Sequence, residues 1–234
     1  MQRKKRTRNR ISLLLLTMLL TSGKWLSAPA YAQGGLSEAE RRQIQAQAAM
    51  IAAEELYDHG DHDKAIEQWR EALRLDPGLV RAHQSLGMAL RGDGQLPEAI
   101  AELREAARLD PRNAGVQADL GDTLQERGDL DAALAAYRAS LALVPNSAPV
   151  HNNLGYVLAR KNDLDGAIAE WRDAIRIDPK YPAPYVNLGE ALESKGDIKG
   201  AITAYERFLE LAPKAPTAAA VRKQIESLKA GKSP

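Results

Sequence analysis

The chain contains no cysteine, which excludes disulfide bonds, thiolate metal sites, thiol nucleophiles and a lipid-modified N-terminal cysteine. Large rings are also scarce, since 5% of the 234 residues are aromatic and there is a single phenylalanine. A core must therefore consist mainly of leucine, isoleucine, valine and alanine, whose small side chains let helices approach closely. The apolar share of 44% and the charged share of 27% are typical of a folded chain.

Acidic residues are missing from the first 32 positions, which carry seven lysines and arginines. The remaining residues hold 25 basic and 31 acidic side chains, so their net charge is −6. Binding to nucleic acid depends on neutralising phosphates with lysine and arginine. A net negative body therefore predicts no nucleic-acid partner.

The N-terminal segment has the three-part layout of a secretory signal peptide. A basic stretch ends at Arg10, an apolar run covers residues 11–20, and a small-residue cleavage site follows at Ala30-Tyr31-Ala32. The apolar run is shorter than the roughly 20 residues that cross a bilayer. We predict a signal peptide over residues 1–32 that is cleaved after Ala32, with an uncleaved N-terminal anchor as the alternative. Either way the body is expected to be extracytoplasmic, in the periplasm, the medium or a lumen, with no membrane span after cleavage.

Prolines recur at a fixed spacing of 34 residues, at Pro77, Pro111, Pro145, Pro179 and Pro213. An alanine stands twelve positions before each proline, and a large apolar residue stands eight positions before it. Four of the units also carry a Leu-Gly pair further upstream. Apolar residues at spacings of three and four indicate helices, and a repeat of this length indicates stacked structural units.

Each unit is predicted to form two helices joined by a short turn. The turn is marked by a residue that tolerates left-handed backbone geometry, namely Gly60, Gly94, Gly128, Asn162 or Gly196. An aspartate precedes four of the second helices and is expected to cap them: Asp61, Asp129, Asp163 and Asp197.

This pattern resembles the tetratricopeptide repeat family, in which Leu-Gly, a large residue, alanine, an aromatic residue and proline recur within 34 positions. The fourth unit shows it best, with Leu154-Gly155, Leu158, Ala167, Trp171, Ala174 and Pro179. The resemblance covers residues 46–213. It implies an all-α, right-handed α-solenoid of five helix-turn-helix repeats, at about 46–79, 80–113, 114–147, 148–181 and 182–215. The first tryptophan of the family pattern is replaced by Ala49, His83, Gln117, His151 and Tyr185, which are packing variants.

Both ends of the repeat region carry signals of their own. Ser37 and Glu40 form a capping-box pattern that opens a long first helix reaching about Asp58. At the other end, Val221, Ile225 and Leu228 line one face of a helix at about 216–230 that is expected to cap the stack. We therefore predict a short linker over residues 33–37, one solenoid over 38–230 and a tail over 231–234.

The resemblance also implies that the first helix of each pair lines a concave surface that binds an extended peptide or a partner protein. The residue immediately before each Leu-Gly position is expected to point into this groove, namely Ile51, Ser85, Asp119, Asn153 and Asn187. Two asparagines at matched positions resemble the asparagine ladder of O-linked N-acetylglucosamine transferases, in which amides hold a peptide backbone. The alternative is that these asparagines are merely solvated.

Acidic side chains outnumber basic ones on this face, which favours a neutral or basic peptide whose binding weakens with salt. The predicted binding residues are Met88, Arg91, Asp119, Asp122, Asn153, Tyr156, Asn187 and Glu190. Two other classes of function stay open. One is an assembly subunit of an envelope or secretion complex that uses the convex face or repeat edges and self-associates. The other is a glycan-handling protein, for which Tyr156 is the one clear aromatic platform.

Signatures of catalysis are missing, since the sequence has no glycine-rich phosphate loop, nucleophile elbow or paired-histidine zinc signature. Residues 58–63, Asp-His-Gly-Asp-His-Asp, are the one local concentration of possible metal ligands. They fall on a turn that lacks a closed coordination geometry, which favours a solvated turn. His83 and His151 occupy a packing position. We predict a protein that is not an enzyme, with no catalytic residue, no metal and no cofactor.

Overall fold

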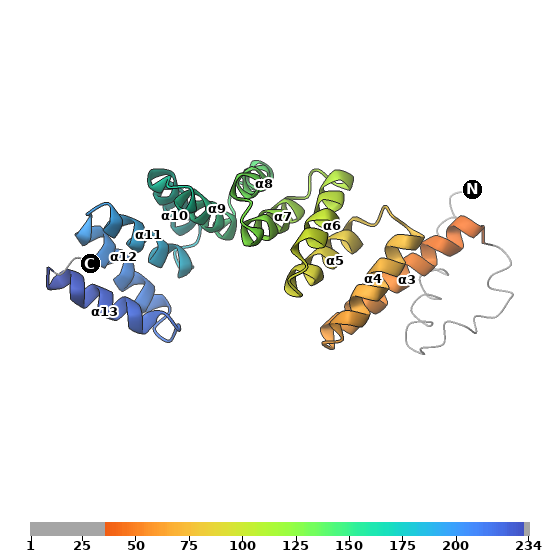
Figure 1. Cartoon of the computed structure of the whole chain (residues 1–234), viewed down its shortest axis with the longest axis horizontal. Coiled ribbons are helices and arrows are strands. Elements are labelled where there is room, and N and C mark those ends of the chain that lie inside the picture. Colours follow the sequence, from red (N-terminus) through yellow and green to blue (C-terminus); the bar gives the residue numbers. More distant parts are fainter. Residues whose placement is uncertain (1–35, 232–234) are drawn as a thin grey trace, which may run out of the picture. The chain divides into compact units, whose positions relative to one another are not determined.

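A computed structural model describes residues 36–231, so the predicted signal peptide lies outside the described residues. Over residues 36–231 the chain forms eleven α-helices and no strand (Figure 1). None of these helices is both long enough and apolar enough to cross a membrane. The helices are α3 (Glu38–Asp58), α4 (His62–Leu75), α5 (Val80–Gly92), α6 (Leu96–Leu109), α7 (Ala114–Arg127), α8 (Leu130–Leu143), α9 (Ala148–Arg160), α10 (Leu164–Ile177), α11 (Ala183–Ser194), α12 (Ile198–Leu211) and α13 (Ala218–Lys229).

The helices belong to two compact units whose boundary in the sequence lies between Asp93 and Gly94. In the first unit α3 packs against α4, and α4 packs against α5. In the second unit α7 pairs with α8, α9 with α10 and α11 with α12, while α13 packs on α12. These helix pairs confirm the all-α solenoid of helix-turn-helix repeats. The boundary between the units falls between the two helices of the second repeat, where the repeat pattern continues unchanged.

The turns between paired helices adopt left-handed geometry at the predicted positions. The backbone φ angle is 85° at Gly60, 75° at Gly94, 91° at Gly128 and 79° at Gly196. Asn162 has a φ of 64° and is the one described non-glycine residue with a positive φ. Asparagine reaches this region at a lower cost than most residues do, so the fourth repeat keeps the same turn.

Caps on the second helices are only partly as predicted. Asp163 Oδ1 accepts a hydrogen bond from the backbone N–H of Gly166 at 2.9 Å, and Asp197 caps α12 in the same way. The predicted caps at Asp61 and Asp129 are wrong, because neither side chain accepts such a bond. Asp61 instead lies 3.0 Å from the ammonium of Lys64, and Asp129 pairs with Arg127.

The residue at the third helical position differs between these helices. In α10 and α12 this residue is a glycine, and a Cβ on Gly166 would lie 2.5 Å from Asp163 Oδ2. Lys64 and Ala132 hold the position in α4 and α8. A Cβ there does not by itself prevent a cap, since Asn113 Oδ1 accepts from the backbone N–H of Val116 at the same position of α7 at 3.2 Å.

Replacing Asp163 with alanine is expected to lower the free energy of unfolding by about 1 kcal/mol, because the first turn of α10 loses its cap. Replacing Asp129 is the matched control, since only an exposed ion pair is lost and the change is expected to stay below about 0.5 kcal/mol. Urea denaturation followed by circular dichroism measures both values. Equal losses in the two variants would show that the cap contributes nothing.

Paired helices of the second unit approach closely at the glycine of each Leu-Gly pair. A Cβ added to Gly121 would lie 2.6 Å from the ring of Tyr137, and one added to Gly155 would lie 2.7 Å from the ring of Trp171. Gly189 faces Tyr205 in the same way. The close contact explains why a residue that weakens helices by about 1 kcal/mol recurs in the middle of them.

The ends of the described helices follow the predicted pattern. Ser37 Oγ accepts a hydrogen bond from the backbone N–H of Glu40 at 3.2 Å, and a Glu40 carboxylate oxygen accepts one from the backbone N–H of Ser37 at 2.8 Å. On α13 the apolar residues Val221, Ile225 and Leu228 are buried against the preceding helix pair. A capping box thus opens α3, and α13 covers the last repeat.

Candidate functional site

The first helices of the second unit lie next to one another, since α9 contacts both α7 and α11. They carry six of the eight predicted binding residues: Asp119 and Asp122 on α7, Asn153 and Tyr156 on α9, and Asn187 and Glu190 on α11. Met88 and Arg91 lie on α5 and therefore belong to the first unit.

Side-chain hydrogen bonds join α7, α9 and α11 in a continuous chain. Asn153 Nδ2 donates to Asp122 Oδ1 at 2.8 Å, and Asn152 Nδ2 donates to Asn153 Oδ1 at 3.1 Å. Asn187 Nδ2 then donates to Asn152 Oδ1 at 3.0 Å. We call Asp122, Asn152, Asn153 and Asn187 the polar ladder. Its amides are held in fixed orientations, and each still has donor or acceptor capacity, since a primary amide has two N–H groups and two lone pairs.

Asn152 is the member of the ladder that reasoning from the sequence missed. It precedes Asn153 by one position, so helical geometry places its side chain largely toward the protein interior, where it is buried. The interior position is what lets it reach both Asn153 and Asn187. The matching positions of the other repeats hold Met50, Gln84, Ala118 and Val186, so a polar residue in a mostly apolar register is the signal in the sequence that could have pointed to it.

Two buried tyrosines on second helices support the polar residues of this face. The hydroxyl of Tyr137 lies 2.6 Å from Asp122 Oδ1 and 3.0 Å from Gln125 Oε1. The hydroxyl of Tyr205 donates to Glu193 Oε2 at 3.0 Å. Burial, together with the bond to Glu193, raises the pKa of the Tyr205 phenol well above its usual value. The phenol therefore remains a donor and fixes the carboxylate that accepts from it.

A pocket of about 750 Å³ lies beside the ladder, where α11, α12 and α13 meet. Asn187, Glu190, Glu193, Tyr205 and Gln224 contribute its polar lining. Gln224 Nε2 donates to Glu193 Oε1 at 2.5 Å. Burial, and then the charge of Glu193, raise the pKa of the Glu190 carboxyl. A basic group in this pocket would relieve the repulsion between the two carboxylates.

Tyr156 presents the most exposed ring of the predicted face, at 40% exposure. The guanidinium carbon of Arg160 lies 5.9 Å from the centroid of this ring, within the range of a cation–π contact. The ring and the cation together form a platform on α9 that is accessible to a ligand.

Three of the five residues that replace the first tryptophan of the repeat pattern have a common structural role. His83 Nε2 lies 3.1 Å from the carbonyl oxygen of Pro77, and His151 Nε2 lies 2.9 Å from that of Pro145. The hydroxyl of Tyr185 donates to the carbonyl oxygen of Pro179 at 3.0 Å. Each polar ring thus ties the start of a first helix to the proline that closes the preceding repeat.

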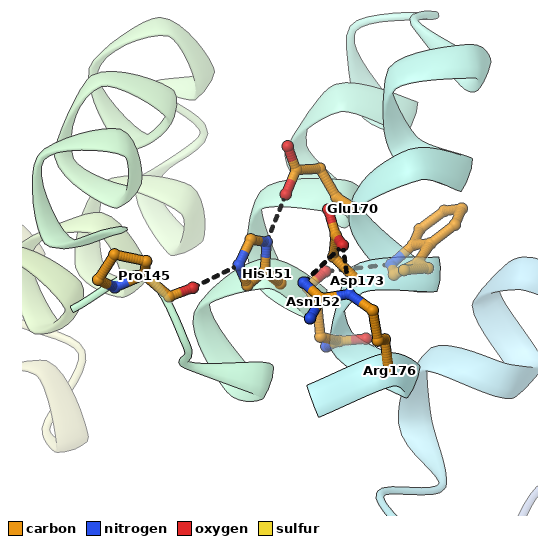
Figure 2. A network of polar contacts seen from close by, with 7 residues as sticks. Pro145, His151, Asn152, Glu170, Asp173 and Arg176 are labelled. Atoms are coloured by element: carbon orange, nitrogen blue, oxygen red, sulfur yellow. Dashed lines mark hydrogen bonds and ion pairs between the residues drawn. The ribbon is translucent and has the colours of Figure 1, made fainter. Parts of the chain in front are cut away.

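Figure 2 shows that His151 also contacts α10, where its Nδ1 atom lies 2.6 Å from Glu170 Oε2. Asp173, one turn further along α10, accepts a hydrogen bond from Arg176 at 2.9 Å. Among the described residues, His151, Glu170 and Asp173 are the one group that brings three possible metal ligands together. Both carboxylates already have a partner within the protein, so the group joins α9 to α10.

The turn over residues 58–63 does not gather its possible ligands around one point. His59 Nδ1 lies 2.6 Å from the backbone carbonyl oxygen of Glu55, and the ring of His62 stacks on Tyr57 with centroids 4.6 Å apart. These contacts are those of a helix end, as the sequence predicts.

Comparisons with known proteins agree on one family. A model described as tetratricopeptide repeat matches residues 52–114 and 118–182, and a second model with that description matches residues 158–225. Among solved structures, the MamA protein aligns with a TM-score of 0.67 and 27% identity over 73% of this chain and 93% of that chain. No curated protein matches the chain.

Two further structures show the same fold at lower identity. YrrB, described as a TPR protein with an unusual peptide-binding site, has a TM-score of 0.66 and 21% identity over 76% of this chain and 92% of that chain. PilF of Pseudomonas aeruginosa has a TM-score of 0.64 and 22% identity, over 81% of this chain and 94% of that chain.

Proposed function

Since the chain belongs to the tetratricopeptide repeat family, we propose that it is an exported, non-catalytic scaffold that binds an extended peptide segment of a partner protein. The structural neighbours support an interaction scaffold, and one of them is described as having a peptide-binding site. The proposed binding face is that of α7, α9 and α11 in the second unit.

The polar ladder is the observation that carries this proposal. Its amides and its carboxylate come from three successive first helices and are held by hydrogen bonds of 2.8 to 3.1 Å. Pre-positioned groups bind with a smaller loss of side-chain entropy than mobile ones. Donors and acceptors at repeating positions match the repeating N–H and C=O groups of an extended backbone, whatever its side chains.

The charge of the face favours a neutral or basic ligand. Asp119, Asp122, Glu190 and Glu193 contribute carboxylates along it, and Arg160 contributes a cation. Burial raises the pKa of the Glu190 carboxyl, and the charge of the neighbouring Glu193 raises it further. Binding of a basic segment is therefore expected to weaken as salt increases.

Export is proposed from the layout of residues 1–32, where a basic stretch, an apolar run and a small-residue site occur in that order. The protein would then meet its partner in the periplasm, in the medium or in a lumen. Sequencing the N-terminus of the mature protein tests this directly. A chain that keeps residues 1–32 and remains in the cytoplasm would contradict export.

The replacement of both Asn153 and Asn187 with alanine tests the binding face. Partners are first captured from an extracytoplasmic extract with the wild-type protein, and their affinity for each variant is then measured by calorimetry. Two backbone hydrogen bonds at about 1 kcal/mol each correspond to a loss of about tenfold or more. Thermal unfolding of the variant separates a loss of binding from a loss of fold.

A second candidate, an assembly subunit, is favoured by a pocket formed by α10, α11 and α12 of the second unit. This pocket has a volume of about 620 Å³ and is lined by three cations, Arg172, Lys199 and Arg207, by one carboxylate, Asp197, and by the apolar side chains of Ile175 and Leu188. An acidic surface with an apolar residue would fit there. Replacing Arg172 and Lys199 with alanine is the matched variant. Loss of the captured partner in this variant, with binding intact in the ladder variant, would favour assembly over peptide capture.

A further inference from the structure

Among residues 36–93 of the first unit, two buried side-chain atoms have no hydrogen-bond partner, Trp69 Nε1 and Glu54 Oε1. Both residues line the same pocket of about 280 Å³, which α3, α4 and α5 enclose. Buried polar atoms without a partner are rare in native proteins, and each one calls for an explanation. An unpaired donor and an unpaired acceptor beside one pocket indicate a ligand that has a hydrogen-bond acceptor for the first and a donor for the second.

The fourth repeat shows how the same donor is normally satisfied. Trp171 lies three repeats after Trp69, and its Nε1 donates to the backbone carbonyl oxygen of Asn152 at 3.1 Å. The carbonyl at the matching position of the first repeat belongs to Met50, and it does not accept from Trp69. Trp69 is 3% exposed, so solvent does not reach most of its surface. Its ring packs against Tyr57 with centroids 5.6 Å apart.

Glu54 has a cationic neighbour and still lacks a hydrogen bond at Oε1. Arg81 Nε lies 3.0 Å from this oxygen, which makes an ion pair, but the N–H is not aligned for a hydrogen bond. The carboxylate therefore keeps acceptor capacity while its charge is partly balanced. Asp58 also lines the pocket, so the pocket has two carboxylates, Glu54 and Asp58, and one cation, Arg81.

Exposed apolar side chains flank these polar atoms. Met88 is 44% exposed and Tyr57 is 39% exposed, and both line the pocket. Large apolar side chains that remain open beside a concave polar site are typical of a surface that receives an aliphatic group.

We propose that this Trp69 pocket binds one extended residue of a peptide through both its backbone and its aliphatic side chain. The pocket is lined by Glu54, Tyr57, Asp58, Trp69, Arg81, Ser85 and Met88. The backbone carbonyl accepts from Trp69 Nε1, and the backbone N–H of the same residue donates to Glu54 Oε1. An extended residue presents both groups to one side, as in antiparallel sheets where paired residues exchange two bonds. The side chain packs on Met88 and Tyr57. The proposal rests on the proposed function, peptide binding, and gives it a residue preference in the first unit.

The test uses N-acetyl-leucine methylamide, the smallest probe with a peptide group on each side of an aliphatic residue. The indole N–H resonances of the full-length protein are followed by NMR during a titration, and Trp69→Phe and Trp171→Phe assign them. The Trp69 resonance is expected to move downfield and saturate, while that of Trp171 stays in place. Met88→Ala is expected to weaken binding at least threefold. An analogue with an ester oxygen in place of the leucine N–H is expected to bind at least fivefold more weakly.

Stability measurements on the same two variants add an independent readout. Trp69→Phe removes a donor without a partner, so its thermal midpoint is expected to fall less than that of Trp171→Phe, since both variants lose the same ring volume. Trp171→Phe removes a satisfied bond, so its midpoint is expected to fall. A fall for Trp69→Phe that equals or exceeds that for Trp171→Phe would overturn the idea that this donor awaits a ligand.

The titration would overturn the proposal if the Trp69 resonance did not move, if that of Trp171 moved equally, or if neither Met88→Ala nor the ester changed the affinity. The titration needs no captured partner, so it stands apart from the ladder experiment. If the titration contradicts binding in the Trp69 pocket while the ladder variants lose affinity, the proposed function stands and only this inference is wrong. Failure of the ladder variants alone leaves a peptide site in the first unit.

Discussion

Replacing Trp171 with alanine is expected to lower the free energy of unfolding of the second unit by about 3–5 kcal/mol. The indole is 3% exposed and packs in the core between α9 and α10. Its removal leaves a cavity and also leaves the carbonyl of Asn152 without the N–H that it accepts from. Because whole domains are stable by about 5–15 kcal/mol, this loss brings the unit close to unfolding. Urea denaturation followed by far-ultraviolet circular dichroism measures the change.

Trp171→Phe is the matched control for this experiment. Phenylalanine keeps most of the ring volume and gives up one hydrogen bond, so a loss of about 1 kcal/mol is expected from the missing bond. If alanine and phenylalanine cost the same, the ring would not be packed as the structure shows.

Replacing Gly155 with alanine is expected to cost about 1–3 kcal/mol, although alanine is the better helix former. The new Cβ would lie 2.7 Å from Trp171 Nε1 and 2.9 Å from its Cδ1, so the indole or the helix must shift. Gly92 offers a matched control near the end of α5, because a Cβ there meets nothing within 4 Å. Gly92→Ala is expected to be neutral or to stabilise by up to about 1 kcal/mol. Thermal and urea unfolding of both variants measures the contrast.

The double variant of Gly155 and Trp171, both replaced with alanine, checks the cause of these losses. If the clash with the indole is responsible, the loss in the double variant is smaller than the sum of the two single losses. Strict additivity would contradict a direct contact between the two residues.

The repeat pattern predicts most of this fold, because the same contacts recur every 34 residues. Asn162 is an example. It stands where the other repeats have glycine, the repeat pattern still predicts a left-handed turn there, and the structure has a φ of 64° at this residue. The closing helix α13 and the capping box at Ser37 occur once each, and both could be predicted from the spacing of residues within a single helix.

The failures come from effects that depend on one neighbour rather than on the repeat. Asp129 has the sequence of a helix cap, yet its carboxylate pairs with Arg127, whereas Asp163 accepts from the backbone N–H of Gly166. The division after Asp93 gives no signal either, because the residues around it keep the repeat register.

The candidate site shows the same limit. Spacing predicts which residues share a helix face, so Asp122, Asn153 and Asn187 could be chosen from the sequence. Their hydrogen-bond partners could not, because Asn152 contributes from the buried side of α9. The missing bond at Trp69 is also invisible in the sequence, where Trp69 and Trp171 occupy equivalent positions.

The contacts between polar rings and closing prolines have a consequence for the length of the molecule. His151 contacts the carbonyl oxygen of Pro145, and Tyr185 contacts that of Pro179. These are equivalent contacts in two consecutive repeats. If residues 148–181 were deleted, Tyr185 would take the place of His151, and its hydroxyl would donate to the carbonyl oxygen of Pro145. Deleting or duplicating a whole repeat would thus keep the contact between consecutive repeats. The number of repeats in the second unit can therefore change during evolution without a new contact having to arise.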